Sequence, residues 1–309
     1  MDKISFIVSC AERAAILEVD AHKPGNVSKM HNFDDTTYED FIRGAKALRA
    51  GIENAANNGF LAGLGKKDLS EIEVGGCIKK IVEDVKKSHA GGNTHLGIAM
   101  LFVPIAGAAG MCIAEGDGFV ELRKNLVRIM DNTTVQDSVN LYDAIKIANA
   151  GGLGKHEFDA RKESSKEELK EKNINLQKLM ELSSGKDRIA EELASGMPII
   201  FDLGVPSIKG IFEETKNIEF AIVQTYLFML SRFPDTLIAK KVGKGKAFEI
   251  SERAERIMRA GGVLTEGGRH AIENFDKYLS SFGSELNPGT TADLIAASLM
   301  VCLLDGLEP

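Results

Sequence analysis

Apolar residues recur three and four positions apart along nearly the whole chain, the spacing that places them on one face of an α-helix. One such face, in the first segment, consists of Ile4, Ile7, Ala11, Ala14 and Ala15. Another, at residues 119–129, has charged residues on its opposite side. The apolar faces and the breaks between them predict about a dozen helices.

Alternating patterns typical of strands are almost absent, and the segment 198–204 (PIIFDLG) is the one short candidate strand. The 309 residues show no repeat of fixed period, and this length suits one large domain. We therefore expect a single all-α domain over residues 1–309, with less than about 5% strand against the usual value of roughly 20–25%.

Three further segments predict particular helices. Residues 134–150 begin after a Thr cap signal and stop at Gly151-Gly152. Residues 209–231 and 290–304 are apolar enough for helices of the core, or of an interface between copies in a homo-oligomer.

Residues 96–114 form a run of 19 without a charged residue, which is long enough to span a bilayer. The run contains Gly97, Pro104, Gly107 and Gly110, and small residues rather than leucines dominate it. A helix at the centre of a large helical domain is also apolar on every side. We expect such a buried helix and no contact with a membrane.

Residues 155–192 differ from the rest because the stretch RKESSKEELKEKN has no apolar face of useful width. The composition predicts a charged excursion, such as a solvated helix. The functional alternative is a lid over a binding site.

The charge balance excludes some partners. Lys and Arg total 38 and Asp and Glu 45, so the net charge is -7, which disfavours bulk nucleic-acid binding. The four cysteines form no CxxC pair, and the N-terminus MDKISFIVSC has no basic region ahead of an apolar stretch. Both features indicate a cytoplasmic protein without a signal peptide.

Polar clusters at the ends of the predicted helices carry the candidate chemistry, since backbone N–H groups at helix N-termini bind anions. In the first cluster, residues 22–35, Pro24-Gly25 turns the chain and holds Lys23 close to Asn26.

His31, Asp34 and Asp35 follow in the same cluster. Adjacent carboxylates near a histidine suit a Mg²⁺ site or a general base. The structural alternative is a capped loop leading into a helix at Thr37, with Asp35 or Thr36 as its N-cap.

The second cluster, GGNTHLG at residues 91–97, precedes the uncharged run. It places Asn93, Thr94 and His95 at the start of a buried helix, where the positive helix end favours a phosphate. Glycines on both sides let a ligand approach the backbone, whereas a lone histidine at a helix start is often a structural hydrogen-bond partner.

The third cluster, residues 231–246, has four lysines within seven residues, among them Lys240 and Lys241. Arg232 and Asp235 flank Pro234 in the same cluster. This local excess of positive charge suits a polyphosphate, and a solvated charged loop is the alternative.

In the fourth cluster, residues 286–299, Pro288-Gly289 turns the chain and Asp293 lies in the first turn of the next helix. The carboxylate of Asp293 either stabilises the positive end of the helix or projects into a binding site. We expect all four clusters to converge on one cleft. ATP would not be held there by a P-loop, because the chain has no GxxxxGK[ST] motif.

Five motifs in this order resemble the triphosphoribosyl-dephospho-CoA synthase family. They are KPGNV at 23–27, the His31, Asp34 and Asp35 group, GNTHLG at 92–97, SRFPD at 231–235 and NPGTTADL at 287–294. The resemblance covers nearly the whole chain and implies an all-helical fold.

The resemblance also implies a reaction, in which the 2′-hydroxyl of 3′-dephospho-CoA displaces adenine from C1′ of ATP. The triphosphoribosyl product is the precursor of the prosthetic group of citrate lyase or malonate decarboxylase acyl carriers. The segment 151–159 departs from the family pattern, because Lys155 stands where a Glu is expected and no Arg is present. Another alcohol, such as a pterin-type coenzyme precursor, is therefore an alternative acceptor.

Breaking the bond at C1′ develops positive charge on the ribose, and ATP brings phosphates that need Mg²⁺ and cations. We assign ATP binding to Lys23, Asn26, Asn93, Thr94, Arg232, Lys240, Lys241 and Asp293. We assign the metal to Asp34 and Asp35, and catalysis to His31, Asp35, His95 and Asp235. Two other hypotheses stay open: an N-glycosidase acting on a nucleotide, and a nucleotide- or CoA-binding protein without catalysis.

Overall fold

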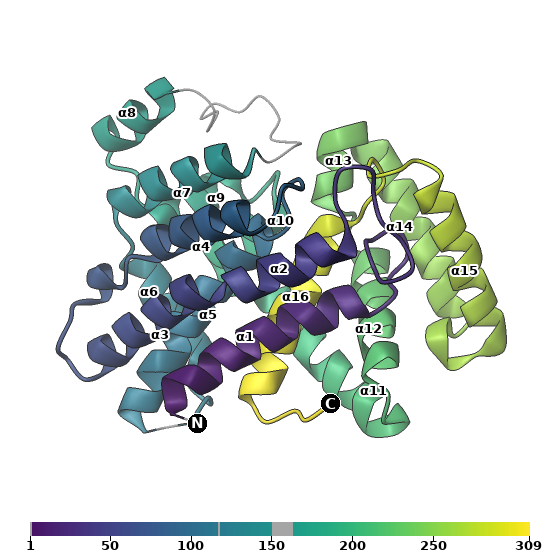
Figure 1. Ribbon diagram of the computed structural model, residues 1–309, viewed down its shortest axis with the longest axis horizontal. Coiled ribbons are helices and arrows are strands. Elements are labelled where there is room, and N and C mark those ends of the chain that lie inside the picture. Colours follow the sequence, from purple (N-terminus) through teal and green to yellow (C-terminus); the bar gives the residue numbers. More distant parts are fainter. Residues whose placement is uncertain (1, 117, 150–162) are drawn as a thin grey trace.

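The structure, a computed structural model, describes residues 2–116, 118–149 and 163–309 (Figure 1). The α-helices are α1 (Lys3–Asp20), α2 (Tyr38–Ala47), α3 (Arg49–Gly63), α4 (Val74–Ser88), α5 (Leu96–Glu115), α6 (Leu122–Asp131), α7 (Val135–Ala148), α8 (Glu163–Glu171), α9 (Leu176–Ser183), α10 (Arg188–Ser195), α11 (Val205–Thr215), α12 (Ile218–Arg232), α13 (Thr236–Val242), α14 (Lys244–Arg259), α15 (Glu266–Ser280) and α16 (Gly289–Leu304). Shorter turns of helix are η1 (Leu69–Ile72), η2 (Ile199–Gly204) and η3 (Gly262–Leu264). Within the described ranges there is no sheet, only an isolated bridge between Ser28 and His31. The all-α prediction is confirmed.

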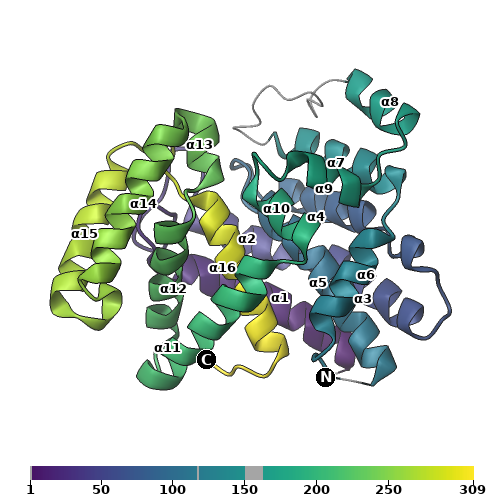
Figure 2. The same cartoon turned by 180° about the vertical axis from the view of Figure 1, so that it is seen from behind.

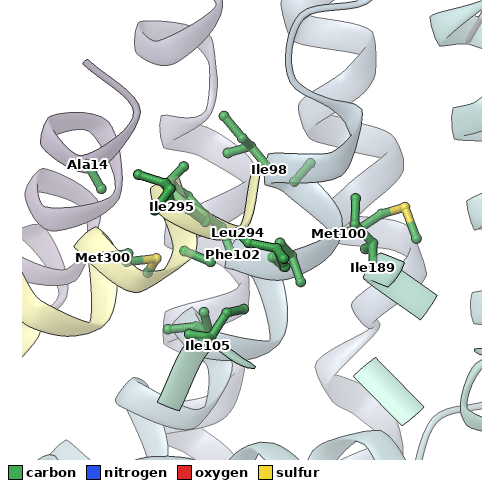
Figure 3. Packing of buried hydrophobic residues seen from close by; sticks show 14 of the residues in the cluster. Ala14, Ile98, Met100, Phe102, Ile105, Ile189, Leu294, Ile295 and Met300 are labelled. Atoms are coloured by element: carbon green, nitrogen blue, oxygen red, sulfur yellow. The ribbon is translucent and has the colours of Figure 1, made fainter. Parts of the chain in front are cut away.

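Helix α5 lies at the centre of the fold, as its uniform apolar surface predicts. It is the one helix among the described residues that is long and apolar enough to cross a membrane. Of its most apolar 18-residue window, 89% is buried inside the protein. Figure 3 shows its side chains packed against those of α16, with Ala14 of α1 and Ile189 of α10 nearby.

Glycines let α3 approach the central helix closely. A Cβ at Gly59 would overlap the carbonyl oxygen of Gly107, and a Cβ at Gly110 would overlap that of Ala56. These contacts between backbones explain why small residues rather than leucines dominate the sequence of α5.

Of the other predicted core segments, α16 and most of α12 are buried, whereas α11 is mostly half-buried or exposed. Nearly every side chain of α16 is inaccessible to solvent. The segment 209–231 is not one helix but two, because Lys216 adopts a left-handed conformation that ends α11. Asn217 then caps α12 by accepting a hydrogen bond from the N–H of Phe220.

Helices α3 to α9 lie on one side of the molecule and α11 to α15 on the other (Figures 1 and 2). Helix α16 lies between the two groups in both views and contacts α1, α5 and α12. This arrangement brings residues from the two ends of the chain together.

Three local predictions need correction. Residues 198–204 contain no strand but the π-helix η2, whose first N–H groups are bonded by the buried Glu192. Helix α7 has Thr134 as its N-cap and ends at Ala148 with Asn149 as its C-cap, and the predicted stop at 151–152 lies outside the described residues. The segment 155–192 is described from residue 163. Its charged stretch forms α8, which is largely exposed and matches the predicted solvated helix, whereas α9 and α10 bury apolar side chains in the core.

Candidate functional site

A cavity of about 290 Å³ opens where α1, α5, α10 and α16 meet. All four polar clusters contribute to its wall, through Asn26, Asn93, Thr94, Gly97, Lys240, Asn287, Gly289, Thr290 and Asp293. These residues come from segments more than 260 positions apart in the chain. The predicted convergence on one cleft is therefore confirmed.

Helix N-termini are directed at this cavity. Leu96 and Gly97 belong to the first turn of α5, and Gly289 and Thr290 to the first turn of α16. Asp187, the N-cap of α10, also lines the wall. The positive ends of these helices favour an anion in this part of the cavity.

Two carboxylates in the wall have contrasting surroundings. Glu18 is buried, and its Oε1 lies 3.0 Å from Nζ of the equally buried Lys23. Asp293 lies against Gly97, where a Cβ would collide with its carboxylate. Burial and the negative charges of Glu18, Asp235 and Asp187 raise the pKa of Asp293 well above its usual value.

Cationic side chains lie at one end of the wall. Lys240 pairs with Asp187, and Lys186 lines the same region from an exposed position. Of the two predicted neighbours on α13, only Lys240 lines the cavity. Lys241 donates instead to the carbonyl oxygen of Ser284 at 2.7 Å.

The remaining wall is apolar. Leu141, Tyr142 and Ile145 of α7 face the cavity together with Leu179 and Met180 of α9. An apolar wall beside a charged one suits a ligand that joins a flat ring or an aliphatic arm to phosphates.

Asparagine side chains supply uncharged polar groups. Asn26 donates through Nδ2 to the hydroxyl of Tyr226 at 2.9 Å and to the carbonyl of Pro24 at 3.3 Å. Tyr226 in turn donates to the same carbonyl, at 2.8 Å. The Oδ1 of Asn287 is buried and accepts no hydrogen bond from the described part of the chain.

Thr94 lines the cavity, and its hydroxyl group contacts two histidines that lie behind the wall. Its Oγ1 lies 3.1 Å from Nε2 of His89 and 2.6 Å from Nδ1 of His95. His95 is fully buried behind Thr94 and does not line the cavity. Burial lowers its pKa to about 3, so its ring is neutral.

Several predicted site residues lie outside the wall. Lys23 is buried, and its ammonium contacts the Glu18 carboxylate and the carbonyls of Glu18 and Ala21. Arg232 is exposed, with its guanidinium 4.6 Å from the centre of the Phe228 ring. Both contribute to local structure rather than to the cavity surface.

Asp235 is a buried cap that joins two helices. Its Oδ1 accepts from the N–H of Leu237 and Ile238 at the start of α13. Its Oδ2 accepts from the N–H and the hydroxyl of Thr291 in α16, both at 2.8 Å. These four hydrogen bonds occupy the carboxylate, which does not line the cavity.

His31, Asp34 and Asp35 lie in the loop before α2. His31 packs against Phe33, and both aspartates are exposed. The N-cap of α2 is Thr37, in a capping box with Asp40, so neither Asp35 nor Thr36 has the predicted capping role. Within the described residues no group of three His, Cys, Asp or Glu side chains is arranged to hold a metal ion.

Sequence reasoning missed Glu18, Lys186, Asp187 and Asn287. Glu18 is a single acid within an otherwise apolar helix face, five residues before Lys23, and this isolated charge was the available signal. Asp187 and Lys186 fall in the segment interpreted as an excursion, so their charge gave no separate signal.

Residues 4–309 match a protein family described as CitG, ATP:dephospho-CoA triphosphoribosyl transferase. A 2-(5''-triphosphoribosyl)-3'-dephosphocoenzyme-A synthase of Klebsiella pneumoniae is 25% identical over 217 residues, 70% of this chain and 62% of that protein. A probable synthase of the same name from Pseudomonas fluorescens is 31% identical over 118 residues, 38% of this chain and 39% of that one. The matched region thus spans less than two thirds of the length of these relatives.

The fold is also similar to a crystal structure from Archaeoglobus fulgidus, described as that of a triphosphoribosyl-dephospho-CoA synthase. The TM-score is 0.59 and the sequence identity 26%. The similarity covers 82% of this chain and 98% of that one.

Proposed function

Because the chain belongs to the ATP:dephospho-CoA triphosphoribosyl transferase family, we propose that it transfers the triphosphoribosyl group of ATP to the 2′-hydroxyl of 3′-dephospho-CoA and releases adenine. One observation carries the proposal: a single cavity combines helix N-termini, lysines and carboxylates with an apolar wall. ATP and the acceptor each join phosphates to less polar groups, and both therefore suit such a wall.

The triphosphate binds at the charged end. Lys240 and Lys186 supply positive charge there, and the first turns of α5 and α16 supply N–H groups. Lys240 is paired with Asp187, so a phosphate would replace or share this partner.

The carboxylates of Glu18 and Asp293 fit a Mg²⁺ ion, because Mg²⁺ is bound by one or two carboxylates together with substrate phosphates. The crowding of negative charge around Asp293 is the observation that favours a cation at this point. When bound, Mg²⁺ neutralises charge on the phosphates. Asp34 and Asp35 are the alternative ligands, although they lie outside the cavity wall.

The same cavity suits the chemistry at C1′. A carboxylate near the ribose stabilises the positive charge that develops as the bond to adenine breaks. Glu18 suits this role because it lines the cavity, where its carboxylate is held 3.0 Å from the Lys23 ammonium. The apolar residues of α7 and α9 would hold the adenine ring or the pantetheine arm and exclude water.

The proposed reaction uses ATP and therefore belongs in the cytoplasm. All four cysteines are buried thiols, which agrees with a reducing compartment. The segment 151–159, which raised the question of another acceptor, lies outside the described residues.

The test is an incubation of the purified protein with ATP and Mg²⁺, with 3′-dephospho-CoA, with a panel of other alcohols, or with no acceptor. Adenine is measured by chromatography and the adduct by mass spectrometry. We expect adenine and adduct in equal amounts with dephospho-CoA. Adenine without any acceptor would indicate an N-glycosidase, and ATP binding without adenine release would indicate a binding protein.

A further inference from the structure

The Thr94 hydroxyl group connects the cavity to a buried histidine that the proposed function does not use. His89 is the C-cap of α4, and Thr94 precedes His95, the N-cap of α5. The distance from His89 Nε2 to Thr94 Oγ1 is 3.1 Å, and both side chains are buried. Thr94 lines the cavity, whereas His89 lies behind it.

A carboxylate lies on the other side of His89. Its Nδ1 is 3.8 Å from Oδ1 of Asp40, slightly beyond hydrogen-bond length. Asp40 is held in place because its Oδ2 accepts from the N–H and the hydroxyl of Thr37 at 2.9 and 2.8 Å. These bonds to Oδ2 leave Oδ1 of Asp40 on the side that faces His89.

This arrangement selects one set of proton positions. A proton on Nδ1 of His89 faces the Asp40 carboxylate, which leaves Nε2 free to accept from the Thr94 hydroxyl. His95 then donates from Nδ1 to Thr94 Oγ1, across 2.6 Å. The Thr94 oxygen is thus oriented by two imidazoles.

Gly44 of α2 provides the space for these contacts. A Cβ at this position would overlap the His95 ring and would lie 3.1 Å from Thr94 Oγ1. The backbone of α2, which also carries Asp40, is therefore packed directly against the Thr94 hydroxyl group and the His95 ring.

We propose that Thr94, His89 and Asp40 form a proton relay that removes the proton of the acceptor hydroxyl group in the cavity. This inference rests on the transfer reaction proposed above. It names Thr94 as the residue that contacts the acceptor, and His89 and Asp40 as residues that act through it. The relay has the arrangement of an Asp-His-hydroxyl triad, in which the carboxylate stabilises the imidazolium.

Protons and electron pairs balance in the proposed transfer step. The acceptor O–H proton passes to Thr94 Oγ1 as the Thr94 proton passes to His89 Nε2. The acceptor oxygen forms its bond to C1′, and the C1′–N9 bond breaks with its electron pair leaving on adenine. Adenine takes a proton from water, and the His89 imidazolium returns one to water.

The charges around His89 suit a base at neutral pH. Burial lowers its pKa first of all, and Arg43 of α2 and Lys86 of α4 act in the same direction. Asp40 opposes them by favouring the protonated ring. His95, the titratable group that faces it from the α5 side, is neutral.

The test compares Thr94→Val, Thr94→Ser and His89→Gln with wild type, and uses the exposed His270→Gln as control. We expect Thr94→Val and His89→Gln to lower kcat for adenine release about a hundredfold, the usual size of general-base catalysis, with little change in the KM for ATP. Thr94→Ser keeps the hydroxyl group and should retain most of the activity. The fall of kcat at acid pH in wild type should be absent in His89→Gln.

Other results would overturn the relay. If Thr94→Ser is as inactive as Thr94→Val, or if His89→Gln keeps wild-type kcat and its acid limb, the hydroxyl and the histidine have only structural roles. Nitrogen NMR of His89 gives a readout that needs no activity: the relay requires the proton on Nδ1, and a proton on Nε2 contradicts it. Wild-type protein that releases no adenine from ATP but shows the Nδ1 tautomer would refute the proposed function and leave this contact with a structural role only.

Discussion

Asp187 uses its two carboxylate oxygens for different elements. One accepts a hydrogen bond from the N–H of Ala190 at 3.1 Å and caps α10, and the other pairs with Lys240 of α13. The pair joins the two sides of the cavity at its charged end, and both residues line the wall.

We predict that Lys240→Met raises the KM for ATP about tenfold or more, because a charge-assisted contact to a phosphate contributes roughly 1.5–3 kcal/mol. The measurement is steady-state adenine release against ATP concentration. Lys209→Met is the matched control, since it breaks a comparable pair with Asp305 away from the cavity. An equal change in both variants would argue against a phosphate contact at Lys240.

Asp293→Asn should lower kcat for adenine release about a hundredfold or more, while the thermal melt stays close to that of wild type. The reason is that Asp293 lines the cavity between Glu18 and the first turn of α5. Asp35→Asn is the informative comparison, because the sequence alone pointed to Asp35 and the structure places it outside the wall, accepting from the Thr36 hydroxyl at 3.2 Å. A large loss in Asp35→Asn with a small one in Asp293→Asn would reverse this assignment.

Gly59→Ala should destabilise the protein, because its new methyl group meets the backbone of Gly107, which cannot move without shifting α5. Overpacking of this kind costs about 1–3 kcal/mol in the free energy of unfolding. Gly107→Ala is the control, since its Cβ would meet no atom closer than the end of the Ile129 side chain, at 3.2 Å. Urea unfolding of both variants measures the difference, and equal stabilities would refute the close approach of the two helices.

Glu192 predicts a pH dependence of stability. Burial raises its pKa to about 7 in the folded protein, from the ordinary value of 4.5 for a glutamate. The folded state therefore holds this proton more tightly than the unfolded state does. The resulting stabilisation is complete below pH 4.5 and is lost as the pH rises through 7, by roughly 3 kcal/mol in all.

Unfolding of wild type and Glu192→Gln between pH 4 and 8 isolates this effect. The difference in stability between the two proteins should change over that interval in the direction that favours Glu192→Gln at high pH. Glu191→Gln removes the neighbouring, more exposed carboxylate and should show no such change. A constant difference for Glu192→Gln would mean that its carboxyl group titrates normally.

The sequence was sufficient for the fold class, because helical periodicity depends on local spacing. The apolar run at 96–114 predicts the central helix from its composition alone, without any knowledge of tertiary contacts. The π-helix at 199–204 could not be predicted, because its first N–H groups are held by Glu192 of another helix. That interaction is tertiary and leaves no local signal in PIIFDLG.

The site was predicted at the level of segments but less well at the level of side chains. Lys240 and Lys241 are adjacent in sequence, yet neighbours on an α-helix point about 100° apart, so only one of them lines the cavity. The role of a carboxylate is also not evident from the sequence. Asp235 accepts hydrogen bonds at the N-termini of two helices and does not reach the cavity, whereas Glu18 lines the cavity from a helix that the sequence assigned to the core.

The central claim is that one cavity brings ATP and dephospho-CoA together for triphosphoribosyl transfer. The most direct measurement is the amount of adenine released per molecule of adduct as the concentration of 3′-dephospho-CoA is varied at saturating ATP and Mg²⁺. The account predicts adenine release that depends on dephospho-CoA and matches adduct formation one to one. Adenine release that is independent of dephospho-CoA, or no adenine release at any concentration of it, would contradict the account.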